Sequence, residues 1–198
     1  MKISYGKLLV ALSLGLLCPL VNATVVQYAA SLSGPNESPA NTSTGTGFAQ
    51  VFIDDVANTM EVKVTFSGLT GTTTASHIHA ATATPGTGTA VVATQTPTFG
   101  GFPLGVTSGS YDQTFDLLLA STYRAGYITS NGGTAATAAA ALLAAIKDGK
   151  AYLNIHTTAY PGGEIRGFLT KVVPDESATA LLLTFALVGL MRFYRRRP

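Results

Sequence analysis

A strict alternation of apolar and polar residues in segment 60–66 constrains the fold of this chain most strongly. Its four apolar residues alternate with three polar ones in the order Met-Glu-Val-Lys-Val-Thr-Phe. Successive side chains of a β-strand point to opposite faces, so this period indicates a strand that is buried on one face. Similar short runs separated by turn signals predict further strands at residues 25–32, 47–53, 74–79, 90–93, 110–118, 151–156 and 164–169. About eight short strands favour a mainly all-β fold, an antiparallel Greek-key-like sandwich or barrel.

Two segments depart from this strand pattern. Residues 134–147 are rich in Ala and Leu, with Thr134 placed to cap the first turn and Gly149 placed to end the last. This arrangement predicts one short helix. Residues 97–109 contain four Gly and two Pro and are expected to form a loop.

The N-terminus has the pattern of an export signal. Lys2 and Lys7 precede an apolar run, Leu8–Leu17, which is too short to span a membrane. Val21 and Ala23 supply the small residues that signal peptidase requires. We therefore expect residues 1–23 to be a signal peptide, cleaved after Ala23, and the chain to be exported. The alternative of lipidation at Cys18 is disfavoured because Leu17 precedes it where a small residue is needed.

The C-terminus has three parts in a fixed order. Val173, Pro174 and Asp175 come first, and the apolar segment 178–191 follows them. A cluster of basic residues ends the chain: Arg192, Arg195, Arg196 and Arg197. Because arginines favour the cytoplasmic side, the pattern predicts a separate transmembrane helix with the body of the protein outside. The alternative, a buried C-terminal helix, leaves the arginines unexplained.

This C-terminal arrangement resembles the PEP-CTERM sorting signals of Gram-negative bacteria, in particular the VPDSG variant. It departs from that variant at Glu176-Ser177, where Ser-Gly is usual. The resemblance covers residues 173–198 and leaves residues 24–172 as one domain. It implies an inner-membrane-anchored intermediate, removal of the tail by an exosortase-type protease, and delivery to the cell envelope or extracellular matrix.

Charge and motifs exclude several classes of function. Residues 24–173 hold six bases and eight acids, a formal net charge of −2, so the basic residues concentrate at the two ends. We therefore expect no nucleic-acid partner. The body contains no nucleophile elbow, phosphate loop or His-Glu-x-x-His motif, and no cysteine. These absences predict that the protein is not an enzyme.

All three histidines of the chain lie on predicted strands. His77 and His79 flank Ile78, while Asn154 and His156 alternate with Leu153 and Ile155; the five-residue order is Tyr-Leu-Asn-Ile-His. If the aliphatic residues face the core, the histidines share the solvent face of the sheet. Should the two strands be neighbours, three imidazoles can form an open site for Zn or Cu. The alternative is that the histidines bond the backbone and one another around a structural turn.

Three polar residues are candidates to lie behind the ligands and orient them: Glu164, Asn154 and Arg166. Glu164 and Arg166 follow a Pro-Gly-Gly turn and flank Ile165, which places them on one strand face. One hypothesis has Glu164 orienting His79 or His156. The other has Glu164 in an ion pair or hydrogen-bonded to the histidine strand. Asp54-Asp55 offers a calcium site as an alternative to an ordinary solvated turn.

Several blocks of the body resemble the CHRD domain, named for chordin. They are Leu-Ser-Gly-Pro-Asn-Glu at 32–37, Ser-Gly-Leu at 67–69, Ala-Ser-His-Ile-His at 75–79, Ala-Tyr-Leu-Asn-Ile-His-Thr at 151–157 and Tyr-Pro-Gly-Gly-Glu-Ile-Arg-Gly at 160–167. The chain departs from the family at Ser38 and Ala80. The resemblance implies an extracellular β-rich module. The His-x-His pair is also similar to one ligand strand of copper/zinc superoxide dismutase, but the other ligands of that enzyme have no counterpart here.

We therefore expect a non-enzymatic module of the envelope or extracellular matrix that binds a polysaccharide or another protein. The alternative is an extracytoplasmic metal-binding protein that uses a three-histidine surface site. A third possibility is an enzyme acting on extracellular carbohydrate.

Overall fold

A computed structural model describes residues 25–173 of the chain. The strands are β1 Val26–Ser33, β2 Thr46–Asp54, β3 Thr59–Ser67, β4 Thr73–His79, β5 Gly109–Asp116, β6 Tyr152–Thr157, β7 Ile165–Phe168 and β8 Thr170–Lys171. The helices are α1 Ala125–Ser130 and α2 Ala135–Lys147, with short 3-10 turns at Gly34–Asn36 and Ala120–Thr122. Thr134 caps α2 as expected, because its hydroxyl accepts a hydrogen bond from the backbone N–H of Thr137. The expected strand at 90–93 is wrong, since that segment forms only an isolated bridge, and α1 was not predicted.

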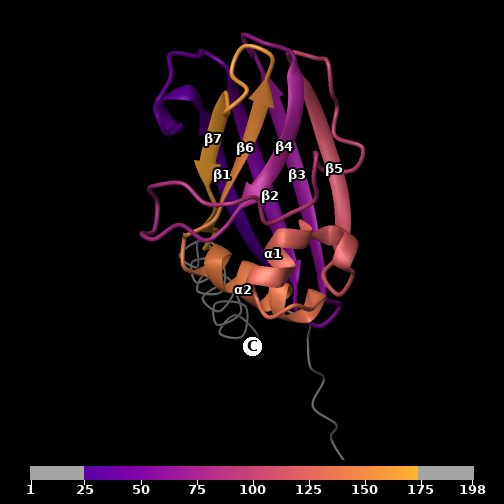
Figure 1. The fold of residues 1–198 in the computed structure, drawn as a ribbon. Coiled ribbons are helices and arrows are strands. Elements are labelled where there is room, and N and C mark those ends of the chain that lie inside the picture. The colour runs from indigo at the N-terminus through magenta and orange to yellow at the C-terminus, as the bar shows by residue number, and fades with distance from the viewer. Residues whose placement is uncertain (1–24, 174–198) are drawn as a thin grey trace, which may run out of the picture.

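All the strands belong to one antiparallel sheet that curls into a half-barrel (Figure 1). The order across the sheet is β4-β6-β7-β1-β2-β3-β5, and β8 pairs with β1. Strands β1, β2 and β3 are consecutive hairpin neighbours, but β4 leaves them and pairs with β6 at the other edge. The mainly antiparallel β-fold is thereby confirmed. The displacement of β4 brings the two histidine segments side by side.

Curling folds both halves of the sheet around one hydrophobic core. Ile78, Leu153, Ile155 and Ile165 from the β4-β6-β7 half are fully buried. They belong to the same core cluster as the apolar residues of β2 and β3, such as Val62. The alternation predicted from the sequence is confirmed, because these aliphatic side chains take one face of the strands. The residues between them must therefore project from the opposite face.

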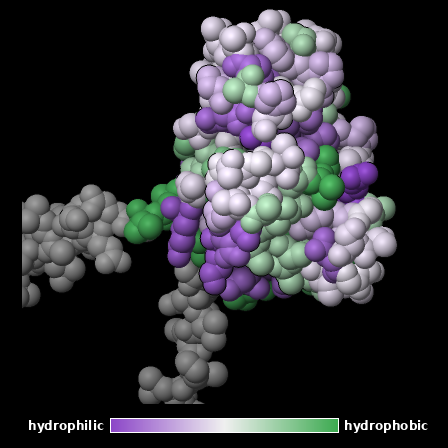
Figure 2. Space-filling view, turned by 60° about the vertical axis from the view of Figure 1, so that its left-hand side comes forward, coloured by the Kyte–Doolittle hydropathy of each residue, from purple (hydrophilic) through white to green (hydrophobic). Residues whose placement is uncertain are grey.

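The outer surface is weakly polar. In Figure 2 most of the visible face has intermediate hydropathy, with hydrophilic and hydrophobic residues interspersed. This pattern is expected from a chain with only 11% charged residues.

The expected signal peptide, Pro174, Asp175, the apolar segment 178–191 and the terminal arginines lie outside the described residues. Within residues 25–173, no helix has the length and apolar character needed to cross a membrane.

Candidate metal centre

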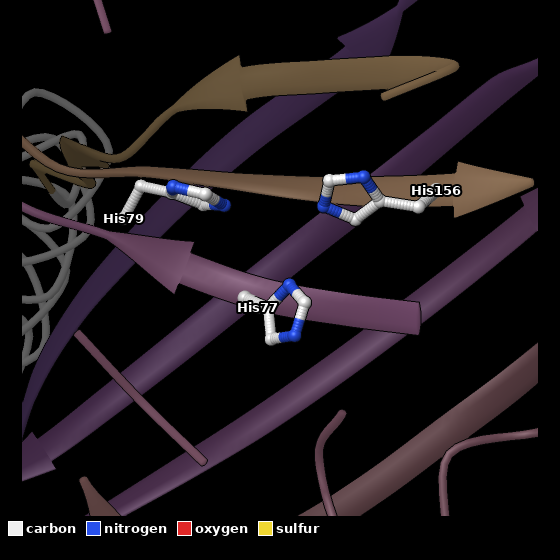
Figure 3. Close-up of side chains that lie close together, drawn as sticks. All are labelled: His77, His79 and His156. Carbon is white, nitrogen blue, oxygen red and sulfur yellow. The ribbon is translucent and has the colours of Figure 1, made fainter. Parts of the chain in front are cut away.

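The three histidines project from the same side of two paired strands, β4 and β6 (Figure 3). In the register of this pair, His77 lies opposite Asn154, and His79 lies opposite Tyr152. His156 is two residues beyond Asn154 on β6, so it is the diagonal neighbour of His77. The conditional prediction made from the sequence is met, since the strands are neighbours and the rings share one face.

The three rings converge on a common point. One ring nitrogen from each histidine lies within 4.8 Å of the corresponding nitrogens of the other two. The ring centroid of His77 is 5.2 Å from that of His156 and 5.8 Å from that of His79. The angle between the ring planes is 69° for His77 and His156 and 83° for His77 and His79. The arrangement is therefore a cluster around a centre and not a stack.

Backbone carbonyls hold one nitrogen of each ring. Nε2 of His77 lies 2.7 Å from the carbonyl oxygen of Pro97, Nδ1 of His79 lies 2.9 Å from that of Ala90, and Nδ1 of His156 lies 2.9 Å from that of Pro161. A carbonyl oxygen only accepts hydrogen bonds, so each of these nitrogens carries the ring proton. The opposite nitrogen of each neutral ring then presents a lone pair.

These opposite nitrogens have no hydrogen-bond partner. Nδ1 of His77, Nε2 of His79 and Nε2 of His156 are all buried and unpaired. Buried polar atoms are nearly always satisfied, and an unsatisfied one costs about 1–3 kcal/mol. Three such atoms facing one another therefore point to a missing common partner. The expectation that the rings bond the backbone is met, but within the described residues no hydrogen bond joins one ring to another.

A metal ion fits this cluster after a small contraction. Zinc binds imidazole nitrogen at about 2.0–2.1 Å, which sets neighbouring ligand nitrogens roughly 3.3–3.5 Å apart. The nitrogens here lie within 4.8 Å of one another, so the widest pair must approach by up to roughly 1.4 Å. Small rotations about the side-chain bonds supply that movement. The residues present thus suit a first-row ion that accepts nitrogen ligands.

The expectation that this is a surface site is wrong. His77 and His79 are only 6% and 8% exposed, and His156 is half-buried. The long connection between β4 and β5 covers this face of the sheet and carries both Ala90 and Pro97. Period-2 alternation places a side chain on a face, but a loop decides whether that face meets solvent.

Burial also determines the protonation state of the rings. Desolvation lowers the pKa of His77 to about 4, against the opposing effect of the Pro97 carbonyl. Nearby His156 and His79 add a smaller lowering. Burial likewise lowers the pKa of His79 and of His156 below the usual range. All three imidazoles are therefore neutral near pH 7, which is the form that binds a metal ion.

Glu164 does not orient a histidine. Its carboxylate accepts hydrogen bonds from the hydroxyls of Ser43 and Thr157, at 2.6 Å each, and from the backbone N–H groups of Thr70 and Gly71. Burial alone would raise the pKa of Glu164, but these four donors outweigh it and lower the pKa. Glu164 thus joins three loops, and its bond to Thr157 is the predicted contact with the histidine strand.

Arg166 and Asn154 do lie on the histidine face. The register places Asn154 between His77 on β4 and Arg166 on β7. The guanidinium group of Arg166 donates hydrogen bonds to the carbonyl oxygens of Asn36 and Gly88, the latter at 3.0 Å. Gly88 is two residues from Ala90, whose carbonyl oxygen bonds His79. Arg166 therefore stabilises the covering loop next to this contact.

Two contributors to the site escaped the sequence reasoning. Glu37 is 9% exposed, and its carboxylate lies 3.7 Å from Nε of Arg166. Tyr152 stacks on the ring of His79, with centroids 4.8 Å apart, and its hydroxyl accepts a hydrogen bond from the N–H of Ala90. Tyr152 alternates with Asn154 and His156 along β6, so its position on this face was readable from the pattern. The orienting carbonyls left no sequence signal, because every residue has one.

The calcium alternative at Asp54-Asp55 gains no support. The carboxylate of Asp54 accepts hydrogen bonds from the backbone N–H groups of Val56 and Ala57, at 3.0 and 2.8 Å. This is the usual way in which an Asp closes a turn.

Fold and site together define a β-domain of half-barrel form with a covered three-histidine cluster on its outer face. The family model described as "CHRD domain" matches residues 28–169. The chain therefore belongs to the CHRD domain family, as the sequence blocks indicated. Searches among curated proteins and among solved structures give no match.

Proposed function

We propose that this CHRD domain is a non-enzymatic module that binds one first-row transition-metal ion, Zn or Cu, through His77, His79 and His156. A single observation carries the proposal. Three buried lone pairs converge within 4.8 Å, while the other nitrogen of each ring is held by a carbonyl oxygen. Metal-binding histidines typically show this second hydrogen bond, which fixes the tautomer and the orientation of the ring.

The geometry favours binding over catalysis. The two buried acidic groups of the described residues are engaged elsewhere: Glu164 accepts four hydrogen bonds, and Glu37 faces Arg166. A hydrolytic metal site needs a general base or acid within hydrogen-bond reach of the reacting atoms. Neither carboxylate is placed for that task.

Metal titration of the full chain in detergent tests the proposal directly. Because all three histidines of the chain belong to the cluster, no other imidazole can contribute. A Cys18→Ser background removes the one thiol. We expect a stoichiometry of one Zn or Cu per chain, abolished by His77→Gln or His156→Gln. The matched control Asp54→Asn/Asp55→Asn, at the acidic turn, should bind as the parent does.

Nitrogen NMR of the unsubstituted protein tests the same proposal without any variant that could misfold. The metal-free protein should show His77 protonated at Nε2 and His79 and His156 at Nδ1. Adding metal should shift the three opposite nitrogens. Unchanged nitrogen shifts, or binding that persists without His77, would refute the metal site.

Export and a role in the envelope or matrix form a second proposal. The low proportion of charged residues in the chain, 11%, together with the mixed hydropathy of the face in Figure 2, favours contact with an uncharged polymer over a charged partner. Cosedimentation with the host's extracellular polysaccharide tests that binding, and retention no greater than that of a neutral control protein would count against it. Mass spectrometry of the exported protein should show a new N-terminus at Thr24 and a C-terminus between Pro174 and Ser177.

A further inference from the structure

The histidine cluster offers ligands without negative charge. Its three imidazoles are neutral because their rings are largely buried and their unpaired nitrogens face one another, while a carbonyl oxygen fixes which nitrogen of each ring carries the proton. Within residues 25–173, the residues that gather in metal-binding geometry are these histidines alone, with no carboxylate or thiolate among them. Whatever charge a bound ion carries is therefore left uncompensated by its ligands.

The surroundings do not supply the missing charge. The row His77–Asn154–Arg166 crosses three adjacent strands, so a permanent cation lies two strands from His77 and one strand from His156. Arg166 is 4% exposed and is paired with Glu37 at 3.7 Å, so this pair has no net negative charge. The amide of Asn154, the nearest group in the row, is neutral, and its Oδ1 has no partner.

Burial makes the charge of the ion matter. His77 and His79 are 6% and 8% exposed, so bulk water screens the cluster weakly. The cost of burying an ion rises with the square of its charge, so a dication loses far more hydration than a monocation. Zinc also takes a fourth ligand in tetrahedral geometry, which the three nitrogens of the cluster do not supply, whereas Cu(I) is stable with three ligands.

We infer that the site selects monovalent copper, Cu(I), over Zn(II) and Cu(II). This inference rests on the proposed metal-binding function and specifies its ligand. A carrier of cuprous ion, or a site that stabilises copper in its reduced form, is the role that follows for the domain.

Anaerobic competition titrations measure this preference. The full chain carrying Cys18→Ser is titrated with Cu(I) against bicinchoninate and with Zn(II) against a zinc chelator, at the same pH. We expect Cu(I) to bind at least tenfold more tightly, and the copper-loaded protein to be silent in electron paramagnetic resonance and slow to oxidise in air. Tighter binding of Zn(II) would overturn the inference but leave the proposed function standing. Binding of neither metal would refute both.

A charge-swap variant tests the electrostatic reason itself. Asn154→Asp keeps the shape of the side chain and adds one negative charge beside the ligands. At an effective dielectric constant of about 20, one unit charge within about 10 Å of the ion changes the affinity for each unit of ion charge by at least roughly tenfold. The ratio of Zn(II) to Cu(I) affinity should therefore rise roughly tenfold or more. The control Asn58→Asp, in the exposed β2–β3 turn, should leave the ratio unchanged. An equal response of the two variants would refute the electrostatic explanation.

Discussion

Acidification of the metal-free protein should reveal two opposite contributions to stability. The first comes from His77, whose pKa falls from 6.5 to about 4 on folding because the ring is buried. Between these values the unfolded chain binds more protons than the folded one, so stability rises with pH and is lost as the pH falls. By linkage, this one group lowers the free energy of unfolding by roughly 2 kcal/mol between pH 7 and pH 4.5. His79 and His156, which face His77, act in the same direction.

The second contribution comes from Glu37 and has the opposite sign. Burial raises the pKa of Glu37 from 4.5 to about 7, although the facing Arg166 opposes this. Between these values the folded protein binds the extra proton, so stability falls as the pH rises and recovers on acidification. The expected recovery between pH 7 and pH 4.5 is also roughly 2 kcal/mol. Glu164, with its lowered pKa, loses its contribution only below about pH 4.5.

The substitution Glu37→Gln separates the two contributions, because glutamine is neutral at every pH. Between pH 7 and pH 4.5 the variant should lose roughly 2 kcal/mol more free energy of unfolding than the parent. Urea unfolding with a metal chelator present, at half-unit pH steps, measures this difference by linear extrapolation. Parallel pH profiles for variant and parent would refute the assignment of a buried, titrating Glu37. The control Glu61→Gln, at a half-buried position on β3 beside Lys63, accounts for the removal of a carboxylate as such.

Two further variants test the loops around the site. Gly163 has a φ of +132°, and a Cβ at this position would lie 2.6 Å from Oε1 of Glu37. Gly163→Ala should therefore lower the free energy of unfolding by roughly 2 kcal/mol. The neighbouring Gly162 has open space around it, so Gly162→Ala should change the free energy of unfolding by less than about 0.5 kcal/mol. Thermal melting of the pair checks this, and equal melting temperatures would contradict it. Glu164→Gln should lower the free energy of unfolding by roughly 3 kcal/mol, because the buried carboxylate accepts four hydrogen bonds. Glu61→Gln, which removes one partner of the ion pair with Lys63, should lower it by less than about 1 kcal/mol. Similar losses for the two variants in urea unfolding would contradict the role of Glu164 in joining the loops.

Much of the fold could be predicted from the sequence alone by two local rules, the alternation of side chains along a strand and the capping of helices. The alternation in 60–66 appears as β3, whose apolar residues are buried while those between them are not. The same rule placed Ile78, Leu153 and Ile155 in the core and hence the histidines on the other face. The cap at Thr134 was equally readable, since it depends on residues within one helical turn. These features depend on the chemistry of neighbours along the chain.

Contacts between distant segments were decided only by the tertiary structure. The pairing of β4 with β6 places His77 opposite Asn154, which is distant in the sequence. The two strands pair because β4 lies at the edge of the curled sheet beside β6, away from β3. The covering of the site depends on where the connection between β4 and β5 lies, and the proton positions depend on three loop carbonyls. Every residue has the same backbone carbonyl group, so composition and periodicity cannot predict which carbonyls orient the histidines. The sequence thus determined which side chains share a face, and only the assembled chain turned that face into a buried site with three lone pairs directed at one point.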